Sequence, residues 1–397
     1  MIWRLQFGVE GSSGLEAPKG TPYLTSRSVA ILGKERKNSA QLEEPSVIRK
    51  VALKEPRMPL TSRLSLLASR FSPLASRLSL LASHFSLLAS HFSPLASMLH
   101  IAWDPLYKHP LPEGHRFPME KYDLIPEQLF YEGTICEAQL YRPGMLSDDM
   151  VLLTHSEAYW HKLTQGTLTP REARRTGFPF SPRLVERGRT IAMGTLRNAY
   201  HAMQHGVAIN GAGGTHHAFT DRGEGFCLLN DIAIAANVLL HRGDIRQALV
   251  VDLDVHQGNG TAQIFRHEPR VFTFSMHCQA NYPLQKEQSD LDIGLPVGCE
   301  DQPYLALLRQ HLPRLLDVVQ PDFVFYLSGV DVLATDKLGR LGLTLQGCRD
   351  RDDYVLRLCH QHGLPVAISL GGGYSPQLRH IIEAHCNTFR LAQEIFF

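Results

Sequence analysis

The sequence of 397 residues lacks the features that mark membrane and secreted proteins. No apolar run reaches the ~20 residues that a membrane-spanning helix needs. The N-terminal stretch has no continuous apolar segment of the kind found in secretory signals. We therefore expect a cytoplasmic protein without membrane contact, with a nuclear location left open.

The chain also has no large excess of positive or negative charge, because it contains 40 Lys and Arg and 39 Asp and Glu. A balanced chain shows no bias toward nucleic acid or membrane surfaces, and we expect no direct nucleic-acid binding. The balance hides two unlike parts. Residues 1–97 hold 13 basic and 6 acidic residues, so the remainder, with 27 and 33, is net acidic.

Cysteine is used sparingly: the chain has seven, no two of them form a CxxC pair, and their number is odd. These facts argue against a disulfide framework and against a cysteine-rich zinc finger. Reduced thiols in an intracellular protein are the simplest interpretation.

Residues 62–97 contain five nearly identical heptapeptides, the first two being SRLSLLA and SRFSPLA. A heptad repeat can indicate a coiled coil. Pro73 and Pro94 would break such a helix, and the serines of each unit favour non-helical local hydrogen bonds. We predict that residues 1–97 are a disordered, low-complexity extension, with an interaction segment or a targeting peptide as alternatives. Met98 follows the last repeat directly, and we expect it to be the natural start.

From Met98 onward, short apolar runs alternate with segments of helical spacing. The pattern predicts strands at 248–256, 271–277, 322–329 and 365–373, and helices at 184–203, 230–242, 303–319 and 352–363. Such alternation implies a parallel sheet covered by helices on both faces. Ligands bind these folds at the carboxyl ends of the strands, so polar residues there are the informative ones. We predict one catalytic domain over residues 98–397.

One apolar run leads into three polar side chains, Asp252, Asp254 and His256 in VVDLDVHQGNG. At a spacing of two residues, they would share one face of a strand. Two carboxylates there would repel each other and resist burial, and a metal cation would offset both charges. Surface carboxylates at a strand end are the alternative, but carboxylate with imidazole is a donor set that suits Zn2+.

Asp331 follows a second apolar run, just after Gly329. Alone, it is explained equally well as a helix N-cap or as a ligand. With Asp254 and His256 it completes a set of two carboxylates and one histidine. Three protein ligands leave a coordination position open for water or substrate, which is typical of a catalytic zinc site; Fe2+ would also suit these ligands.

Two further segments carry side chains suited to proton transfer and to oxyanion stabilisation. His216 and His217 are adjacent in the glycine-rich stretch GAGGTHHAFTDRGEGF, and neutral imidazole can take up and return a proton near pH 7. Tyr374 follows three glycines at the end of an apolar run, where its phenol could donate a hydrogen bond to a developing oxyanion. A half-buried tyrosine after a tight turn explains that segment equally well.

In the order HH, DxDxH, Asp and GGGY, these segments together resemble the histone deacetylase family. The resemblance covers Met98 to Phe397, and THHAFTDRGEGFCLLND, DLDVHQGNGTA and TDKLGRLGLT are most similar to class IV deacetylases and their bacterial relatives. It implies the arginase/deacetylase α/β fold, a single eight-stranded parallel sheet flanked by helices. It also implies removal of acetyl or longer acyl groups from acyl-lysine proteins or peptides, or from acetylated polyamines, with Zn2+ and with K+ as a further cation.

The resemblance implies metal, oxyanion and channel residues at matching positions. Tyr374 would stabilise the oxyanion, and the zinc ligands would be Asp254, His256 and Asp331. The acyl channel would be lined by Gly225, Phe226 and Tyr282, and Arg116 would match the internal-channel arginine of the family. Carbonyl groups resembling the family's monovalent-cation site would be those near Asp252, Asp254, His256 and Ser275.

The resemblance also implies how the adjacent histidines divide the proton transfer. Asp252 would hydrogen-bond His216 and fix its tautomer, and His216 would stay electrostatic. His217 would be the principal general base and then the general acid. Many deacetylases place Asp where this chain has Asn259, the expected partner of His217, and the class IV branch resembles this chain in having Asn. A neutral Asn stabilises imidazolium less than a carboxylate does, so we expect a low His217 pKa and modest turnover.

Two other functions are alternatives. An arginase-like ureohydrolase with two metal ions would need further carboxylates, but Gly258 and Leu333 stand where these would be expected. A non-catalytic acyl-lysine-binding module would be expected to lack a ligand, the histidine pair or the tyrosine, and all of these are present.

Overall fold

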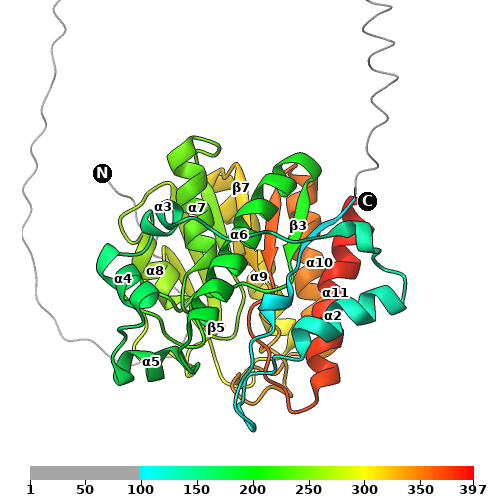
Figure 1. Ribbon diagram of the computed structural model, residues 1–397. Coiled ribbons are helices and arrows are strands. Elements are labelled where there is room, and N and C mark those ends of the chain that lie inside the picture. Colours follow the sequence, from blue (N-terminus) through cyan, green and yellow to red (C-terminus); the bar gives the residue numbers. More distant parts are fainter. Residues whose placement is uncertain (1–97) are drawn as a thin grey trace, which may run out of the picture. The chain divides into compact units, whose positions relative to one another are not determined.

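The computed structural model describes residues 98–397 (Figure 1). The predicted extension at 1–97 and its repeats lie outside these residues. Eight strands form one sheet in the order β2-β1-β3-β8-β7-β4-β5-β6. Every pair of neighbours is parallel, which confirms the predicted eight-stranded parallel sheet. The strands are β1 His100–Ala102, β2 Leu140–Tyr141, β3 Val207–Asn210, β4 Ala248–Asp252, β5 Val271–Cys278, β6 Leu291–Leu295, β7 Phe323–Leu327 and β8 Val366–Ser369.

Helices cover both faces of this sheet (Figure 1). In β7, Val324 and Tyr326 pack in the core on the side of α2, α9, α10 and α11, whereas Phe323 and Phe325 pack on the side of α4, α6 and α7. This alternation lets apolar residues on both sides of a strand be buried, as in other parallel sheets. The helices are α2 Lys121–Tyr131, α3 Asp148–Leu152, α4 Glu157–Gln165, α5 Pro170–Thr176, α6 Pro182–His205, α7 Asp231–Arg242, α8 Asn259–Phe265, α9 Asp301–Val319, α10 Leu345–Gln361 and α11 Leu378–Phe396, with 3-10 turns at Pro105–Tyr107 and Glu137–Gln139.

The four predicted strands and four predicted helices are present, with shifted ends. The helix predicted from residue 352 begins at Leu345, where Thr344 is the N-cap and accepts a hydrogen bond from the Gly347 amide. The helix predicted from residue 230 begins at Asp231 and is capped by Asn230. No helix within residues 98–397 combines the length and the apolar character that crossing a bilayer requires.

The prediction that one strand carries Asp252, Asp254 and His256 on a single face is wrong, because β4 ends at Asp252. Beyond that point, side chains replace strand partners as hydrogen-bond acceptors. Oδ1 of Asp252 accepts from the Asp254 amide at 3.2 Å, and Oδ1 of Asp254 accepts from the His256 amide at 3.0 Å. Such local bonds from Asp compete with a sheet ladder, so Asp254 and His256 lie on a loop.

Arg351 on α10 is fully buried and ties together the loops that follow β4 and β7. Its guanidinium forms an ion pair with Asp352 at 2.8 Å. It also donates hydrogen bonds to the carbonyl oxygens of Gly329 at 2.6 Å and Leu253 at 3.2 Å. One charged side chain therefore fixes the backbone just before Asp254 and Asp331.

We predict that Arg351→Ala lowers the free energy of unfolding by ~3–5 kcal/mol, because Asp352 would stay buried without its cation. The measurement is the midpoint of denaturant unfolding. Arg357→Ala on the same helix is the matched control: Arg357 pairs with Asp353 while 46% exposed, so its loss should cost at most ~1 kcal/mol. Equal costs for the two substitutions would contradict the tying role of Arg351.

Candidate active site

Asp254, His256 and Asp331 converge beyond the carboxyl ends of two neighbouring strands. β4 and β7 are paired with Asp252 opposite Leu327, so the loops that follow them run side by side. One ligand atom from each residue lies within 4.8 Å of the other two, and all three residues are buried. The structure thus brings together the three residues that the sequence pattern selected as metal ligands.

The hydrogen bonds of these residues leave donor atoms for a cation. Backbone amides fix both carboxylates: Asp254 Oδ2 accepts from the Gly372 amide and Asp254 Oδ1 from the His256 amide, each at 3.0 Å, and Asp331 Oδ1 accepts from the Val255 amide at 3.0 Å. Asp254 Oδ1 and Asp331 Oδ2 face the imidazole of His256, whose Nδ1 is 3.0 Å from the first and 3.2 Å from the second. Asp331 Oδ2 is buried without a hydrogen bond. Two carboxylate oxygens and one imidazole nitrogen fit Zn2+.

The two carboxylates differ in how readily they ionise. Burial, together with the charge of Asp254, raises the pKa of Asp331 to about 7. Burial also opposes ionisation of Asp254, but the imidazoles of His216 and His256 hold its pKa well below the usual range. A pair of buried acids that resists carrying two negative charges is typical of a site that binds a cation.

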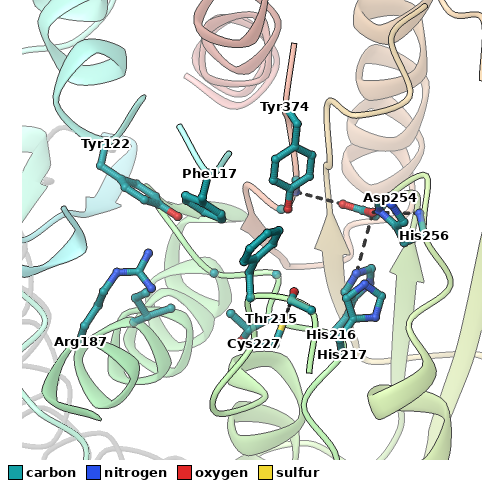
Figure 2. Close-up of a pocket in the computed structure, with 17 residues that line it drawn as sticks. Phe117, Tyr122, Arg187, Thr215, His216, His217, Cys227, Asp254, His256 and Tyr374 are labelled. Carbon is teal, nitrogen blue, oxygen red and sulfur yellow. Dashed lines mark hydrogen bonds and ion pairs between the residues drawn. The ribbon is translucent and has the colours of Figure 1, made fainter. Parts of the chain in front are cut away.

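His216 and His217 lie on the loop after β3 and face Asp254 and His256 (Figure 2). His216 Nδ1 is 2.7 Å from Asp252 Oδ2, and His217 Nδ1 is 2.6 Å from Asn259 Oδ1. Asp252 is the last residue of β4 and Asn259 the first of α8, so each predicted partner lies at hydrogen-bond distance.

The two imidazoles have opposite proton affinities, because only His216 has a carboxylate partner that offsets its burial. Burial alone would lower the pKa of His216, but the charges of Asp252 and Asp254 raise it to about 8. Burial and the neighbouring imidazoles of His216 and His256 hold the pKa of His217 well below its usual value. His217 is therefore neutral at pH 7 and able to accept a proton.

Three glycines bring Tyr374 next to the ligand residues. A Cβ on Gly372 would lie 2.0 Å from Asp331 Oδ2, so only glycine lets the backbone pass this closely. The Tyr374 amide donates to Asp336 Oδ2 at 2.6 Å, which holds the end of the loop. Burial raises the pKa of the Tyr374 hydroxyl well above its ordinary value, so the group keeps its proton for donation.

Two pockets meet at this site and share part of their lining. The shared residues are His217, Gly225, Phe226, His256 and Tyr374. The inner pocket extends past Phe117 to Tyr122 and Arg187 (Figure 2). The outer pocket opens between Arg116, Tyr282 and neighbouring exposed side chains. A substrate group that enters by the outer pocket would therefore reach His217 and His256 first.

The predicted channel residues fall into different places. Gly225 and Phe226 line both pockets, and a Cβ on Gly225 would lie 2.6 Å from His217 Cδ2. Tyr282 is 39% exposed and lies at the outer pocket, where its ring is 4.9 Å from that of His217 and its hydroxyl donates to Glu224. Its position at the mouth limits it to contact with the outer part of a substrate.

The prediction that Arg116 lies in an internal channel is wrong. Arg116 is exposed and lines the outer pocket, with its guanidinium 5.1 Å from the centre of the Phe226 ring. The arginine of the inner pocket is Arg187 on α6, which is buried and donates to the Tyr107 carbonyl at 2.7 Å. Arg187 sits within a segment of plain helical spacing, so its sequence context gave no sign of a cavity.

The sequence reasoning also missed the buried charges that shape the site's loops. Asp231 accepts from the Gly214 amide at 3.1 Å and the Thr215 amide at 2.7 Å, which fixes the loop just before His216. Lys121 donates from Nζ to the carbonyl of Gly371 at 2.9 Å, at the start of the glycine run. Asp231 ends the motif THHAFTDRGEGFCLLND, so the sequence contained a signal for it, whereas Lys121 lies 250 residues from the loop it holds and no local motif could reveal it.

Comparisons with known proteins agree with this geometry. The family model described as "Histone deacetylase domain" matches residues 115–389. An uncharacterized protein of Picosynechococcus sp. is 46% identical over 75% of this chain and 99% of its own length. Histone deacetylase 2 of Arabidopsis thaliana is 28% identical over 68% of this chain and 72% of its own. A solved histone deacetylase homologue complexed with SAHA has 24% identity and a TM-score of 0.65, covering 75% of this chain and 84% of its own.

We predict that Asn259→Asp raises the pKa of His217 by ~1 or more, because a carboxylate at this position would favour the imidazolium form. Titration of the imidazole C–H resonance by NMR measures the change. Asn237→Asp is the matched control, since it adds the same charge where the side chain contacts Thr154 rather than His217. An unchanged His217 pKa in Asn259→Asp would show that Asn259 does not set it.

Proposed function

Because the chain belongs to the histone deacetylase family, we propose that it hydrolyses an N-acyl-lysine or a related linear amide with a bound Zn2+ ion. Family membership makes it a deacetylase-type hydrolase. What we propose beyond family membership is the bound metal and the acyl-amine substrate. The observation that carries them is the convergence of Asp254, His256 and Asp331 beside His217 and Tyr374, where the inner and outer pockets meet.

We propose Asp254, His256 and Asp331 as the ligands of Zn2+, with Fe2+ as the other ion that suits them. When bound, the ion would polarise the acyl carbonyl and lower the pKa of a water molecule to ~7. Oδ2 of Asp331 supports this assignment, because it is buried without a hydrogen bond and faces only the His256 imidazole, a second ligand of the proposed ion. The predicted K+ site near Ser275 stays a prediction.

His217 acts as the general base in this proposal. Its Nδ1 donates to Asn259 Oδ1, which leaves Nε2 without a proton and free to accept one from the attacking water. Its lowered pKa keeps it neutral until then. The imidazolium then releases the proton from Nε2 to the leaving amine, so the products are a carboxylate and a free amine. His216, paired with Asp252, supplies positive charge without moving its proton.

Tyr374 and the pocket walls position the acyl group. The tyrosine hydroxyl keeps its proton and donates a hydrogen bond to the oxygen that becomes negative as water attacks. The rings of Phe226 and Tyr374 are 5.8 Å apart, and Phe117 lies 5.2 Å from Phe226, so the pocket wall near the carbonyl is aromatic. Apolar walls exclude water and favour an extended acyl or lysyl chain.

An arginase-like reaction with two metal ions finds no support in the residues around the site. A Cβ on Gly258 would already lie 2.3 Å from Asp252 Oδ2, so no carboxylate fits there. Leu333 is buried in the apolar core. Within residues 98–397, the acidic ligand set is the single group of Asp254, His256 and Asp331. A non-catalytic module would retain the metal ligands but release no acyl group, which the following experiment measures.

The first test is the release of acyl groups from lysine peptides carrying acetyl through myristoyl chains, and from acetylated polyamines. We expect a chelator to abolish release and added Zn2+ to restore it, because the charges of the ligand set need a cation. Asp331→Asn should lose both bound metal and activity. Release that survives complete metal removal would refute the metal-dependent reaction, and zinc-loaded protein without release on any substrate would favour a binding role.

We predict that Tyr374→Phe lowers kcat by ~10²–10³-fold while the metal content stays unchanged, because one preorganised oxyanion donor is lost. Steady-state kinetics together with metal analysis of the same preparation make the measurement. Tyr282→Phe is the matched control, since Tyr282 lies at the outer pocket and its hydroxyl contacts Glu224; we expect its kcat to change little. A fully active Tyr374→Phe would remove Tyr374 from the reaction.

A further inference from the structure

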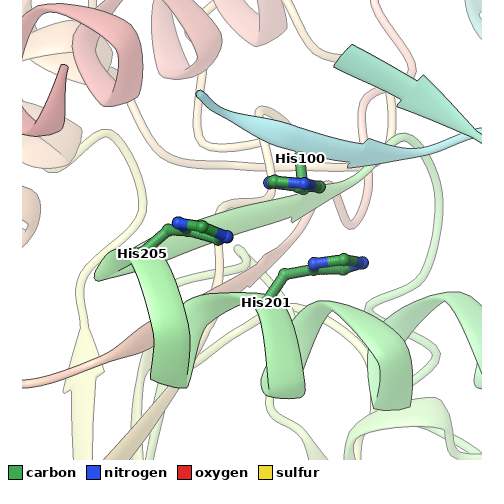
Figure 3. A group of neighbouring side chains, drawn as sticks. All are labelled: His100, His201 and His205. Carbon is green, nitrogen blue, oxygen red and sulfur yellow. The ribbon is translucent and has the colours of Figure 1, made fainter. Parts of the chain in front are cut away.

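Three histidines gather at the edge of the sheet opposite the site described above. His100 begins β1, and His201 and His205 lie on the last turns of α6, which ends at His205 (Figure 3). His100 is paired with Ala208 near the start of β3, whereas His216 follows the other end of that strand. One ring nitrogen from each of the three histidines lies within 4.8 Å of the other two.

The spacing of the two helical histidines favours chelation. Residues four apart lie on the same face of a helix, one turn above the other. His201 and His205 both face β1, and their rings lie 4.1 Å and 4.7 Å from the ring of His100. The end of α6 adds the negative pole of the helix dipole, which favours a cation at this position.

The surroundings keep ligand atoms available. His100 Nδ1 bonds with the Met98 carbonyl at 2.9 Å, which leaves its Nε2 for a ligand bond. Within residues 98–397, the rings of His201 and His205 form no hydrogen bond with the protein, and no carboxylate acts on His100 or His201. Neutral imidazoles without acidic partners are the form that binds transition metals.

We propose that His100, His201 and His205 form a second metal site, which takes a transition-metal ion such as Zn2+ through imidazole ligands alone and ties β1 to the end of α6. The absence of carboxylate ligands here selects Zn2+, Cu2+ or Ni2+ over Mg2+ and Ca2+. All three rings are partly exposed, so an ion can enter from solvent. Binding draws the nitrogens to ~2.0–2.1 Å from the ion, which requires the nearly parallel rings to rotate toward a common point.

A simpler role competes with this proposal, namely a stack of neutral rings that packs β1 against α6. The ring of Tyr141 lies 4.9 Å from that of His201, and the guanidinium of Arg197 lies over Tyr141. Stacking requires a flat ring at each position, but it does not require a ring nitrogen that can bind a metal. Substitution of His201 by Phe therefore separates the two, because Phe can stack in the same place but cannot bind a metal.

The test counts Zn2+ bound per chain after equilibrium dialysis, with Zn2+ alone as the probe. Four full-length proteins are compared: wild type, His201→Phe, Asp331→Asn, and the two substitutions combined. We expect two ions in wild type, one in each single variant, and none in the combined variant. His201→Phe should keep its deacylase activity, because His201 lies outside the candidate active site. His241→Gln, an exposed histidine on α7, is the matched control and should lose no ion.

A spectroscopic measurement gives a second readout that does not depend on folding yield. Cu2+ added to Asp331→Asn should give an electron paramagnetic resonance spectrum with nitrogen couplings from the cluster, and His205→Gln in the same background should remove them. Equal Zn2+ binding by Asp331→Asn and the combined variant would overturn the second site. Failure of the deacylase proposal would leave this comparison untouched, because the two sites share no residue.

Discussion

The burial of two carboxylates in one place is the constraint on which the rest of the site depends. Asp254 and Asp331 both lie below the surface, and their charges would repel strongly at such short range in a medium of low dielectric constant. The fold creates this conflict by pairing β4 with β7, so that the loops behind both strands end side by side. The cation that we propose at this point would resolve the conflict, and the neighbouring histidines and tyrosine would surround it.

The two carboxylates can serve a metal because each divides its oxygens between two tasks. One oxygen of each accepts a backbone amide, from Gly372 or Val255, and thereby fixes the side chain. The other oxygen of each faces the imidazole of His256, and that of Asp254 also accepts the His256 amide. Arg351 holds in place the carbonyl groups of Leu253 and Gly329, which come shortly before Asp254 and Asp331 in the chain. The ligand geometry is therefore prepared before any ion binds, which keeps the cost of reorganisation low.

The histidine pair shows how one change of partner separates two chemically identical side chains. His216 faces the carboxylate of Asp252, and His217 faces the amide of Asn259. His216 is held in its charged form, which suits an electrostatic role. His217 is held in its neutral form, which suits a general base. The choice of Asn at this position also limits how firmly the imidazolium of His217 can be held after it has taken the proton.

The parallel sheet could be predicted from the sequence, because apolar runs alternating with helical segments allow few other folds. Asp254, His256, Asp331 and Tyr374 were marked by their place after such runs, and His217 by its place in a histidine pair within a glycine-rich stretch. The strands β1, β2, β3 and β6 were not predicted, and of these the two-residue edge strand β2 and the three-residue β1 are too short to show a period. Which arginine enters the inner pocket, and which three histidines meet beside β1, became visible only in the folded chain. Such contacts join segments about a hundred residues apart, and spacing along a chain carries no information about them.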